Sequence, residues 1–247
     1  MKRLLMTLLL LLSAAHAAAQ SRADSAQSYV ARGVTWFEKG EVERAISDYN
    51  LAIAFDPRSA AAWLNRAIAR DHKGDHEGAF DDYTRALELD PKQYAAWLNR
   101  GNIFFMRGDF KAALGDYEQA VAIKPREATA WSNRGRVWLA SGELENAVKN
   151  LNRALELDPK FADAWAHRGI IRAERGDYPQ AIADFDYALK LNPRLAATWA
   201  NRGLALLMLG RTEEAERNFV RCKELGGRLN PAAEEFWQEL RKRGKSK

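Results

Sequence analysis

The sequence predicts an all-α fold in which six helix pairs stack on one another and a further helix covers the last pair. The 247-residue chain repeats itself every 34 residues, without an insertion between copies. Apolar residues recur in each copy at spacings of three, four and seven, which indicates two amphipathic helices. A glycine lies in each copy where the chain must turn between these helices. The clearest mark of the period is a large ring: Tyr29, Trp63, Trp97, Trp131, Trp165 and Trp199.

The turn between the two helices of each copy is expected at its central glycine. An alanine follows this glycine by five residues in every copy, and a proline closes the first five copies. The alanine lets neighbouring helices approach closely, and the proline cannot continue the second helix. One such pair cannot bury its own apolar face, so the copies must stack on their neighbours. The central glycines are Gly40, Gly74, Gly108, Gly142, Gly176 and Gly210.

These landmarks resemble the signature of the tetratricopeptide repeat family, a helix–turn–helix unit of 34 residues with an early tryptophan, small residues and a closing proline. The resemblance covers residues 26–228. It implies a right-handed α-solenoid, a superhelix whose inner, concave face is built from the first helix of each repeat. The implied repeats are residues 26–59, 60–93, 94–127, 128–161, 162–195 and 196–228.

The period lapses after Gly227, where we expect a helix that caps the stack. Asn230 is a good N-cap residue and Pro231 suits the first helical position. One face of this helix would carry Phe236, Trp237 and Leu240. We therefore expect a capping helix at residues 229–244 and a basic tail at residues 245–247.

The first residues have the layout of a secretory signal peptide. Lys2 and Arg3 precede an apolar run that ends near Ala15, and small residues follow in an A-x-A pattern. The run is shorter than the roughly 20 apolar residues of a spanning helix, and no other segment is longer. We expect a signal at residues 1–19, a linker at residues 20–25, no transmembrane helix after cleavage, and a periplasmic or secreted protein.

The formal net charge of +5 says little about the partner. Lys2 and Arg3 supply two of the positive charges and the last seven residues supply five, so the body of the chain is nearly neutral. A basic end of this kind is usually a solvated tail, and no nucleic acid is expected as a partner. Cys222 is the only cysteine and stands where other repeats have alanine, so we expect it to be a buried packing residue.

An arginine precedes the central glycine by eight residues in every copy, where the family usually has leucine nearby. Eight residues after the glycine comes an acid or an amide. Positions equally far from the turn of an antiparallel pair face each other, and the planar guanidinium can bind a carboxylate with two parallel bonds. The predicted pairs are Arg32–Asp48, Arg66–Asp82, Arg100–Asp116, Arg134–Asn150, Arg168–Asp184 and Arg202–Asn218.

Asparagine recurs in the first helices, although it is a mediocre helix former. An amide both donates and accepts, so a ladder of asparagines can hold the backbone of an extended peptide. This resembles the asparagine ladders of some peptide-binding members of the family. The alternative, equally open, is that these residues bond to the neighbouring repeat. The ladder is Asn65, Asn99, Asn133, His167 and Asn201, and the other groove candidates are Leu98, Asn102, Phe105, Met106, Arg136 and Leu139.

No arrangement of residues indicates catalysis, a cofactor or a phosphate loop. The one local cluster that could attract a metal, Asp71–Gly78, lies on a turn where Asp, His and Gly are expected anyway. We therefore expect an exported, non-catalytic scaffold that binds a protein or peptide segment in its groove. The alternative is a subunit that self-associates, or joins a larger assembly, through its outer face. A hydrolase would require an acid–base site that the spacing lacks.

Overall fold

The structure is a computed structural model that describes the backbone of residues 2–244 and the side chains of residues 20–239 except residue 232. Every regular element in this part of the chain is an α-helix. The chain forms two compact units, Met1–Ile123 and Lys124–Lys247, each of which is described by itself. This agrees with the predicted all-α class.

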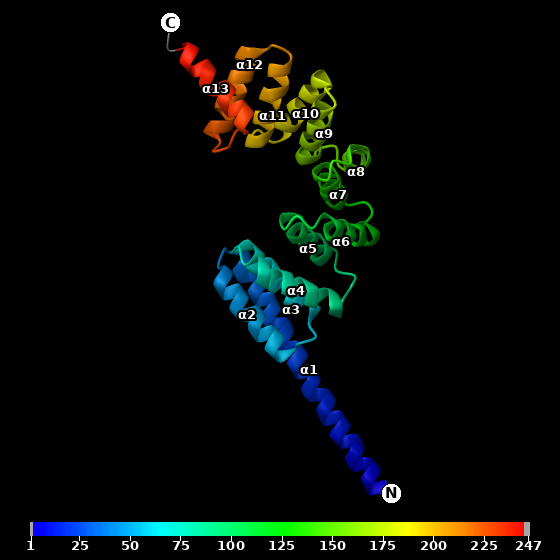
Figure 1. Cartoon of the computed structure of the whole chain (residues 1–247). Helices are drawn as coiled ribbons and strands as arrows, with labels where there is room; N and C mark the ends of the chain where they lie inside the picture. Colours follow the sequence, from blue (N-terminus) through cyan, green and yellow to red (C-terminus); the bar gives the residue numbers. More distant parts are fainter. Residues whose placement is uncertain (1, 245–247) are drawn as a thin grey trace. The chain divides into compact units, whose positions relative to one another are not determined.

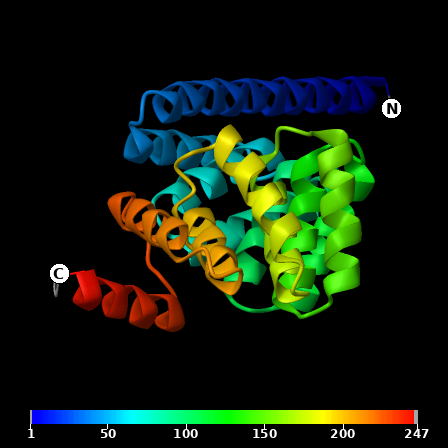
Figure 2. The ribbon, with the colours of Figure 1, turned by 90° about the horizontal axis from the view of Figure 1, so that it is seen from above.

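The first unit holds three helix pairs, which we call repeats 1 to 3 (Figure 1). Within it, α1 packs on α2, α3 on α4 and α5 on α6, and α2 and α4 also contact the first helix of the next repeat. Figure 2 shows α1 and α2 side by side. The helices are α1 (Lys2–Glu38), α2 (Val42–Phe55), α3 (Ala60–His72), α4 (His76–Leu89), α5 (Tyr94–Met106) and α6 (Phe110–Ile123).

The second unit holds repeats 4 to 6 and one additional helix (Figure 1). The same neighbour-to-neighbour packing joins α8 to α9 and α10 to α11. The last helix, α13, packs against α12. The helices are α7 (Ala128–Ala140), α8 (Leu144–Leu157), α9 (Ala162–Glu174), α10 (Tyr178–Leu191), α11 (Ala196–Met208), α12 (Thr212–Glu224) and α13 (Pro231–Gly244).

Helix α1 runs without a break through residues 20–25, which were expected to form a linker. No glycine or proline occurs between Lys2 and Arg32, so nothing in the sequence interrupts the backbone hydrogen bonds. None of the helices in the described part of the chain is long and apolar enough to cross a bilayer. The expected tail at residues 245–247 lies outside the described residues.

The six central glycines end the first helices as predicted. All have positive φ, between 72° and 86°, which a residue with a Cβ adopts only with strain. In repeat 2 the N–H of Gly74 donates to Asp71 O at 2.9 Å, and that of Asp75 donates to Arg70 O at 2.9 Å. This closes the helix end and satisfies carbonyl groups that the helix itself cannot pair.

The tryptophan of each repeat ties its helix to the preceding turn. Its indole Nε1 donates to the carbonyl oxygen of the proline six residues earlier, at 2.8–3.0 Å in all five cases. The ring also supports the arginine three residues later, as in Arg66, whose guanidinium lies 4.7 Å from the centroid of Trp63. The recurring tryptophan therefore fixes both the start of the first helix and the orientation of the arginine.

The predicted arginine pairs all form within their own repeats. Arg100 is typical, because its Nε and Nη2 donate to the two carboxylate oxygens of Asp116 at 2.8 and 2.9 Å. Where an amide replaces the acid, one bond remains, as from Arg134 Nε to Asn150 Oδ1 at 2.6 Å. The other pairs are Arg32–Asp48, Arg66–Asp82, Arg168–Asp184 and Arg202–Asn218.

Four of these arginines also reach back to the preceding repeat, a contact that the spacing did not predict. Arg66 Nη1 donates to Asn50 Oδ1 at 2.6 Å, across the boundary between repeats 1 and 2. One guanidinium therefore joins the two helices of its own repeat to the second helix of the repeat before. The equivalent bonds run from Arg100 to Thr84, from Arg168 to Asn152 and from Arg202 to Asp186.

Helix α13 covers the last repeat. The side chain of Asn230 accepts from the N–H of Ala233 at 2.8 Å, as expected of an N-cap. Phe236 and Trp237 pack against the apolar cluster around Phe219, whereas the side chain of Leu240 lies outside the described residues. Cys222 is fully buried, and burial raises the pKa of its thiol, which agrees with its predicted packing role.

Candidate functional site

The asparagines of the first unit are bonded within the chain. Asn65 Nδ2 donates to the carbonyl oxygen of Ala61 in its own helix at 2.8 Å. Asn102 Oδ1 accepts from the hydroxyl of Tyr117 at 2.7 Å, inside repeat 3. These two groove candidates therefore bond within their own repeats, and neither contact crosses to a neighbouring repeat.

Asn99 interacts with a tyrosine of the preceding repeat. The ring of Tyr83 is fully buried. Burial raises the pKa of its hydroxyl well above the ordinary value, the charge of Asp71 adds to the rise, and the Asn99 side chain opposes it. Asn99 thus lies beside the Tyr83 hydroxyl at the boundary between repeats 2 and 3. The Tyr83 hydroxyl forms no hydrogen bond in the described part of the chain, so Asn99 lies near it without bonding it.

The three apolar candidates of α5 differ in exposure. Leu98 and Phe105 are half-buried, and the ring of Phe105 lies 5.7 Å from that of Phe110. Met106 is 58% exposed. Of these three residues, only Met106 offers most of its side chain to a partner.

In the second unit, His167 and Arg136 lie near each other on α9 and α7. The Nδ1 atom of His167 is buried and has no hydrogen-bond partner in the described part of the chain. The pKa of His167 is lowered to about 4, mainly by burial and in part by the charge of Arg136, while Asp163 acts in the opposite direction. His167 is therefore neutral at pH 7. Asn133, one repeat earlier, has partners of its own within the chain.

Leu139 belongs to the interior of its unit. It packs against the buried cluster that contains Leu151 and Leu155, together with Trp138. Leu139 is partly buried and contributes to the packing of its unit.

Asn201 makes no hydrogen bond within the described part of the chain. It lines a hollow of about 300 Å³ between α9, α10 and α11. The floor is apolar, since Phe185 and Ala205 are both buried. The remaining lining residues are Ile170, Ala173, Glu174, Tyr178, Leu204, Met208 and Asn230.

The residue sixteen positions earlier distinguishes the surroundings of Asn201 from those of Asn99. Asn99 meets Tyr83 of the preceding repeat, and the equivalent of Tyr83 for Asn201 is Phe185. Phenylalanine has no hydroxyl to lie beside the amide. The donor and the acceptor of Asn201 therefore stay available at the mouth of the hollow, which we call the Asn201 hollow.

Most residues of the Asn201 hollow were not among the sequence candidates. The sequence signal that could have identified them is the small size of the side chains at two repeat positions. Ala173 stands where four of the other repeats have phenylalanine or leucine, and Ala205 stands where repeats 3 to 5 have Ile103, Val137 and Ile171; repeat 2 has Asp71 and Ala69 at these two positions. Two large side chains are thus missing from neighbouring first helices of this unit.

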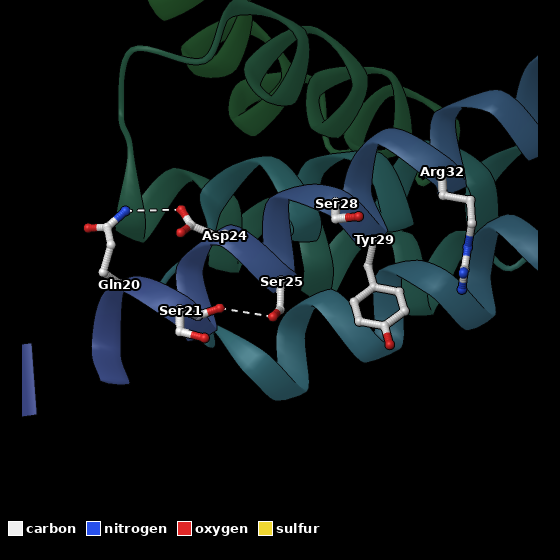
Figure 3. Close-up of a pocket in the computed structure, with 7 residues that line it drawn as sticks. All are labelled: Gln20, Ser21, Asp24, Ser25, Ser28, Tyr29 and Arg32. Atoms are coloured by element: carbon white, nitrogen blue, oxygen red, sulfur yellow. Dashed lines mark hydrogen bonds between the residues drawn. The ribbon is translucent and has the colours of Figure 1, made fainter. Parts of the chain in front are cut away.

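A larger and more polar hollow, of about 690 Å³, runs along α1 (Figure 3). Its serines face solvent: Ser28 is exposed, whereas the equivalent Ala62 is buried. Ser25 donates to the carbonyl oxygen of Ser21 at 2.9 Å, and Gln20 bonds Asp24 at 3.0 Å. This surface carries side chains suited to water, with neighbouring residues bonded to one another. It does not have the features of a binding site.

The turn at Asp71–Gly78 shows a local contact between His76 Nδ1 and Asp71 Oδ1, at 2.7 Å. Within the described residues, no group of three or more His, Cys, Asp or Glu side chains is placed to hold a metal ion. Asp75 instead caps α4 by accepting from the N–H of Gly78 at 3.0 Å. The side chains of this turn thus bond to one another and to the start of α4.

Models of known protein families match most of the chain. Residues 13–173 match the model of the C-terminal domain of cilia and flagella-associated protein 70, a domain of tetratricopeptide repeats. Two models of single tetratricopeptide repeats match residues 162–195 and 185–217. No curated protein matches the chain.

Solved structures with a similar fold include PilF of Pseudomonas aeruginosa, with 17% identity over 90% of this chain and 99% of PilF, and a TM-score of 0.74. A chain of the Cut9–Hcn1 hetero-tetramer of APC/C is 18% identical over 90% of this chain and 44% of its own length, with a TM-score of 0.76. YrrB, described as a protein of this type with an unusual peptide-binding site, is 21% identical over 78% of this chain and 97% of its own, with a TM-score of 0.57. At these identities the likeness concerns the fold.

Proposed function

The chain belongs to the tetratricopeptide repeat family, whose members mediate protein–protein interactions, and on this premise we propose that it is a non-catalytic scaffold. It binds an extended segment of a partner protein along the groove of its first helices. The segment is held at the Asn201 hollow of the second unit.

The observation that carries this proposal is the unbonded amide of Asn201 above an apolar floor. An extended backbone presents one N–H and one C=O at each residue, and a single amide side chain can bond both. The hollow beside it takes a side chain of the same segment. Convergent polar groups at the mouth of an apolar pocket are the usual features of a binding site.

Two further points support the proposal. YrrB, whose fold is similar, is described as having a peptide-binding site. The exposed Met208 at the edge of the hollow has a flexible and polarisable side chain, which suits a surface that adapts to its partner.

Export is part of the proposal, supported by the signal-like layout of residues 1–19. Cleavage after Ala17 or Ala19 would leave Tyr29 and Arg32, which pack on α2, within α1. The exported protein should then begin at Ala18 or Gln20, which mass spectrometry of its N-terminal peptide would show. An N-terminus that still contains Lys2 would contradict the proposal of export.

The binding proposal is tested with peptides selected from a random library on the full protein. Asn201→Ala should weaken the best peptide about two- to tenfold, because one or two hydrogen bonds of roughly 0.5–1.5 kcal/mol are lost. Its melting temperature should not change. Asn99→Ala is the matched control, which should bind normally, since Asn99 belongs to the first unit. Failure of the library to yield any binder, or unchanged binding by Asn201→Ala, would overturn the proposal.

A further inference from the structure

We infer that the Asn201 hollow selects a bulky apolar side chain, leucine or phenylalanine in size, next to a basic residue of the bound segment. This inference rests on the proposed function and names the chemistry of the partner. Two observations support it: the hollow lacks large side chains at two positions, and its rim carries a negative charge.

The size of the hollow favours one side chain over a small-molecule ligand. Its volume of about 300 Å³ is at the lower limit of ligand pockets, which range from roughly 300 to 1,000 Å³. Its floor reaches buried residues, Phe185 at 0% and Ala205 at 2% exposure. A side chain that enters the hollow therefore contacts the core of the unit.

The other repeats show what would fill this space. The position of Ala173 is occupied by an aspartate in repeat 2 and by a large apolar residue in the other four repeats: Phe37, Phe105, Leu139 and Leu207. Leu139 packs on the core of its own unit and Phe105 packs on Phe110. Repeat 5 lacks this bulk, because alanine stands there. A partner's leucine or phenylalanine would supply the missing apolar contact.

The rim of the hollow adds a charge preference. Glu174 follows Ala173 directly at the end of α9, is exposed, and forms no ion pair in the described part of the chain. The nearest arginine in sequence, Arg175, is already bonded to Glu145 at 2.8 Å. Glu174 thus leaves the mouth of the hollow with one uncompensated negative charge. A lysine or arginine beside the inserted side chain would complement it.

The hollow has a side chain that can close over its occupant. Met208, at the end of α11, is 63% exposed, although it belongs to the lining of the hollow. A methionine side chain rotates about three bonds and makes favourable contacts with aromatic rings. It can therefore cover a leucine or a phenylalanine without a rearrangement of the helices.

The experiment selects a random peptide library on phage against the full protein and against Ala173→Phe, which fills the hollow with the side chain that repeats 1 and 3 carry. We expect peptides enriched on the parent protein to share a bulky apolar residue next to lysine or arginine. Ala173→Phe should bind the most enriched peptide at least about tenfold more weakly, since burial of a large apolar side chain is lost.

The charge preference is tested with the same synthetic peptide and its lysine-to-glutamate version. Glu174→Lys should weaken the basic peptide several-fold and favour the acidic one. Glu213→Lys, at an exposed position of α12, is the matched control and should change neither. Circular dichroism melts verify that each variant is folded.

The outcomes separate this inference from the proposed function. Binders that respond to Asn201→Ala but lack the apolar-basic pattern, or that bind Ala173→Phe equally well, would overturn the inference and leave the proposed function standing. Absence of any enriched peptide would overturn both.

Discussion

At the scale of the residue, the recurring arginine is the main polar element of the stack. Each guanidinium is planar and carries five N–H donors, enough to bond the acid of its own repeat and an oxygen of the repeat before. Arg66 and Arg100 do both, and their side chains are only 12% and 15% exposed. Arg32 bonds only Asp48 among the described residues and is 55% exposed. The same residue type thus contributes differently along the chain.

This difference in exposure predicts that the same substitution lowers the free energy of unfolding by different amounts at the two arginines. Arg100→Met leaves the carboxylate of Asp116 buried without its partner, and loss of one partner of a buried pair costs about 3–5 kcal/mol. Arg32→Met should cost about 1 kcal/mol or less, because exposed pairs contribute little. Urea unfolding of both variants measures the difference. Equal losses would show that the exposure of the pair does not govern its contribution.

His167 predicts a dependence of stability on pH. Its pKa in the folded chain is about 4, below the ordinary value of 6.5. Between these two pH values the unfolded chain therefore binds a proton at His167 and the folded chain does not. Its contribution to the free energy of unfolding is present above pH 6.5 and is lost as the pH falls towards 4. His167→Asn should remove about 2–3 kcal/mol of this acid sensitivity. Parallel pH curves for the two proteins would contradict this prediction.

Two other arginines make contacts that the repeat pattern did not predict. Arg70 and Arg172 stand at positions that are normally apolar, and the sequence offered no reason for them. In the structure Arg70 Nη1 binds Asp82 Oδ2 at 2.9 Å, and Arg172 Nη1 binds Asp184 Oδ1 at 3.0 Å. Each acid already holds the recurring arginine of its repeat. A carboxylate has enough lone pairs for both.

At the scale of the element, local residues fix where helices begin and end. A glycine with positive φ ends each first helix, and the absence of glycine and proline before Gly33 lets α1 run unbroken through residues 20–25. Helix α13 depends on packing as well as on its cap, because it makes few contacts other than those with α12 and the cluster around Phe219.

The packing of α13 is tested by a substitution within it. Phe236→Ala should lower the stability of the second unit by about 1–2 kcal/mol, because a half-buried ring is removed from the cluster. Hydrogen exchange should rise most in α11 and α12, which contribute Leu206 and Phe219 to that cluster. Glu235→Ala, at an exposed position of α13, is the control. Faster exchange confined to α13 would show that this helix does not stabilise the last repeat.

At the scale of the whole molecule, each unit is a series of contacts between neighbours. Helices contact their partner in the repeat and the first helix of the next repeat, so stability is approximately a sum of repeats and of their boundaries. A change at one boundary leaves the distant repeats intact. This is why a hollow can exist at the boundary of repeats 5 and 6 without affecting the distant repeats.

The sequence by itself determined the helix pairs, their turns and the six arginine pairs. All of these follow from spacing, because a glycine at a fixed position sets which residues of an antiparallel pair face each other. The ladder of asparagines was also visible as a pattern, but its two interpretations could not be separated. Both require an asparagine on the same face of the first helix.

Only the tertiary structure decided which asparagine is available. That depends on a residue of the neighbouring helix: Tyr83 interacts with Asn99, whereas Phe185 has no hydroxyl for Asn201. The hollow likewise needs Ala173 and Ala205 to meet in space, although they lie on different helices. Contacts between helices are set by how side chains of both fill a shared volume, and the period of one helix does not contain that information.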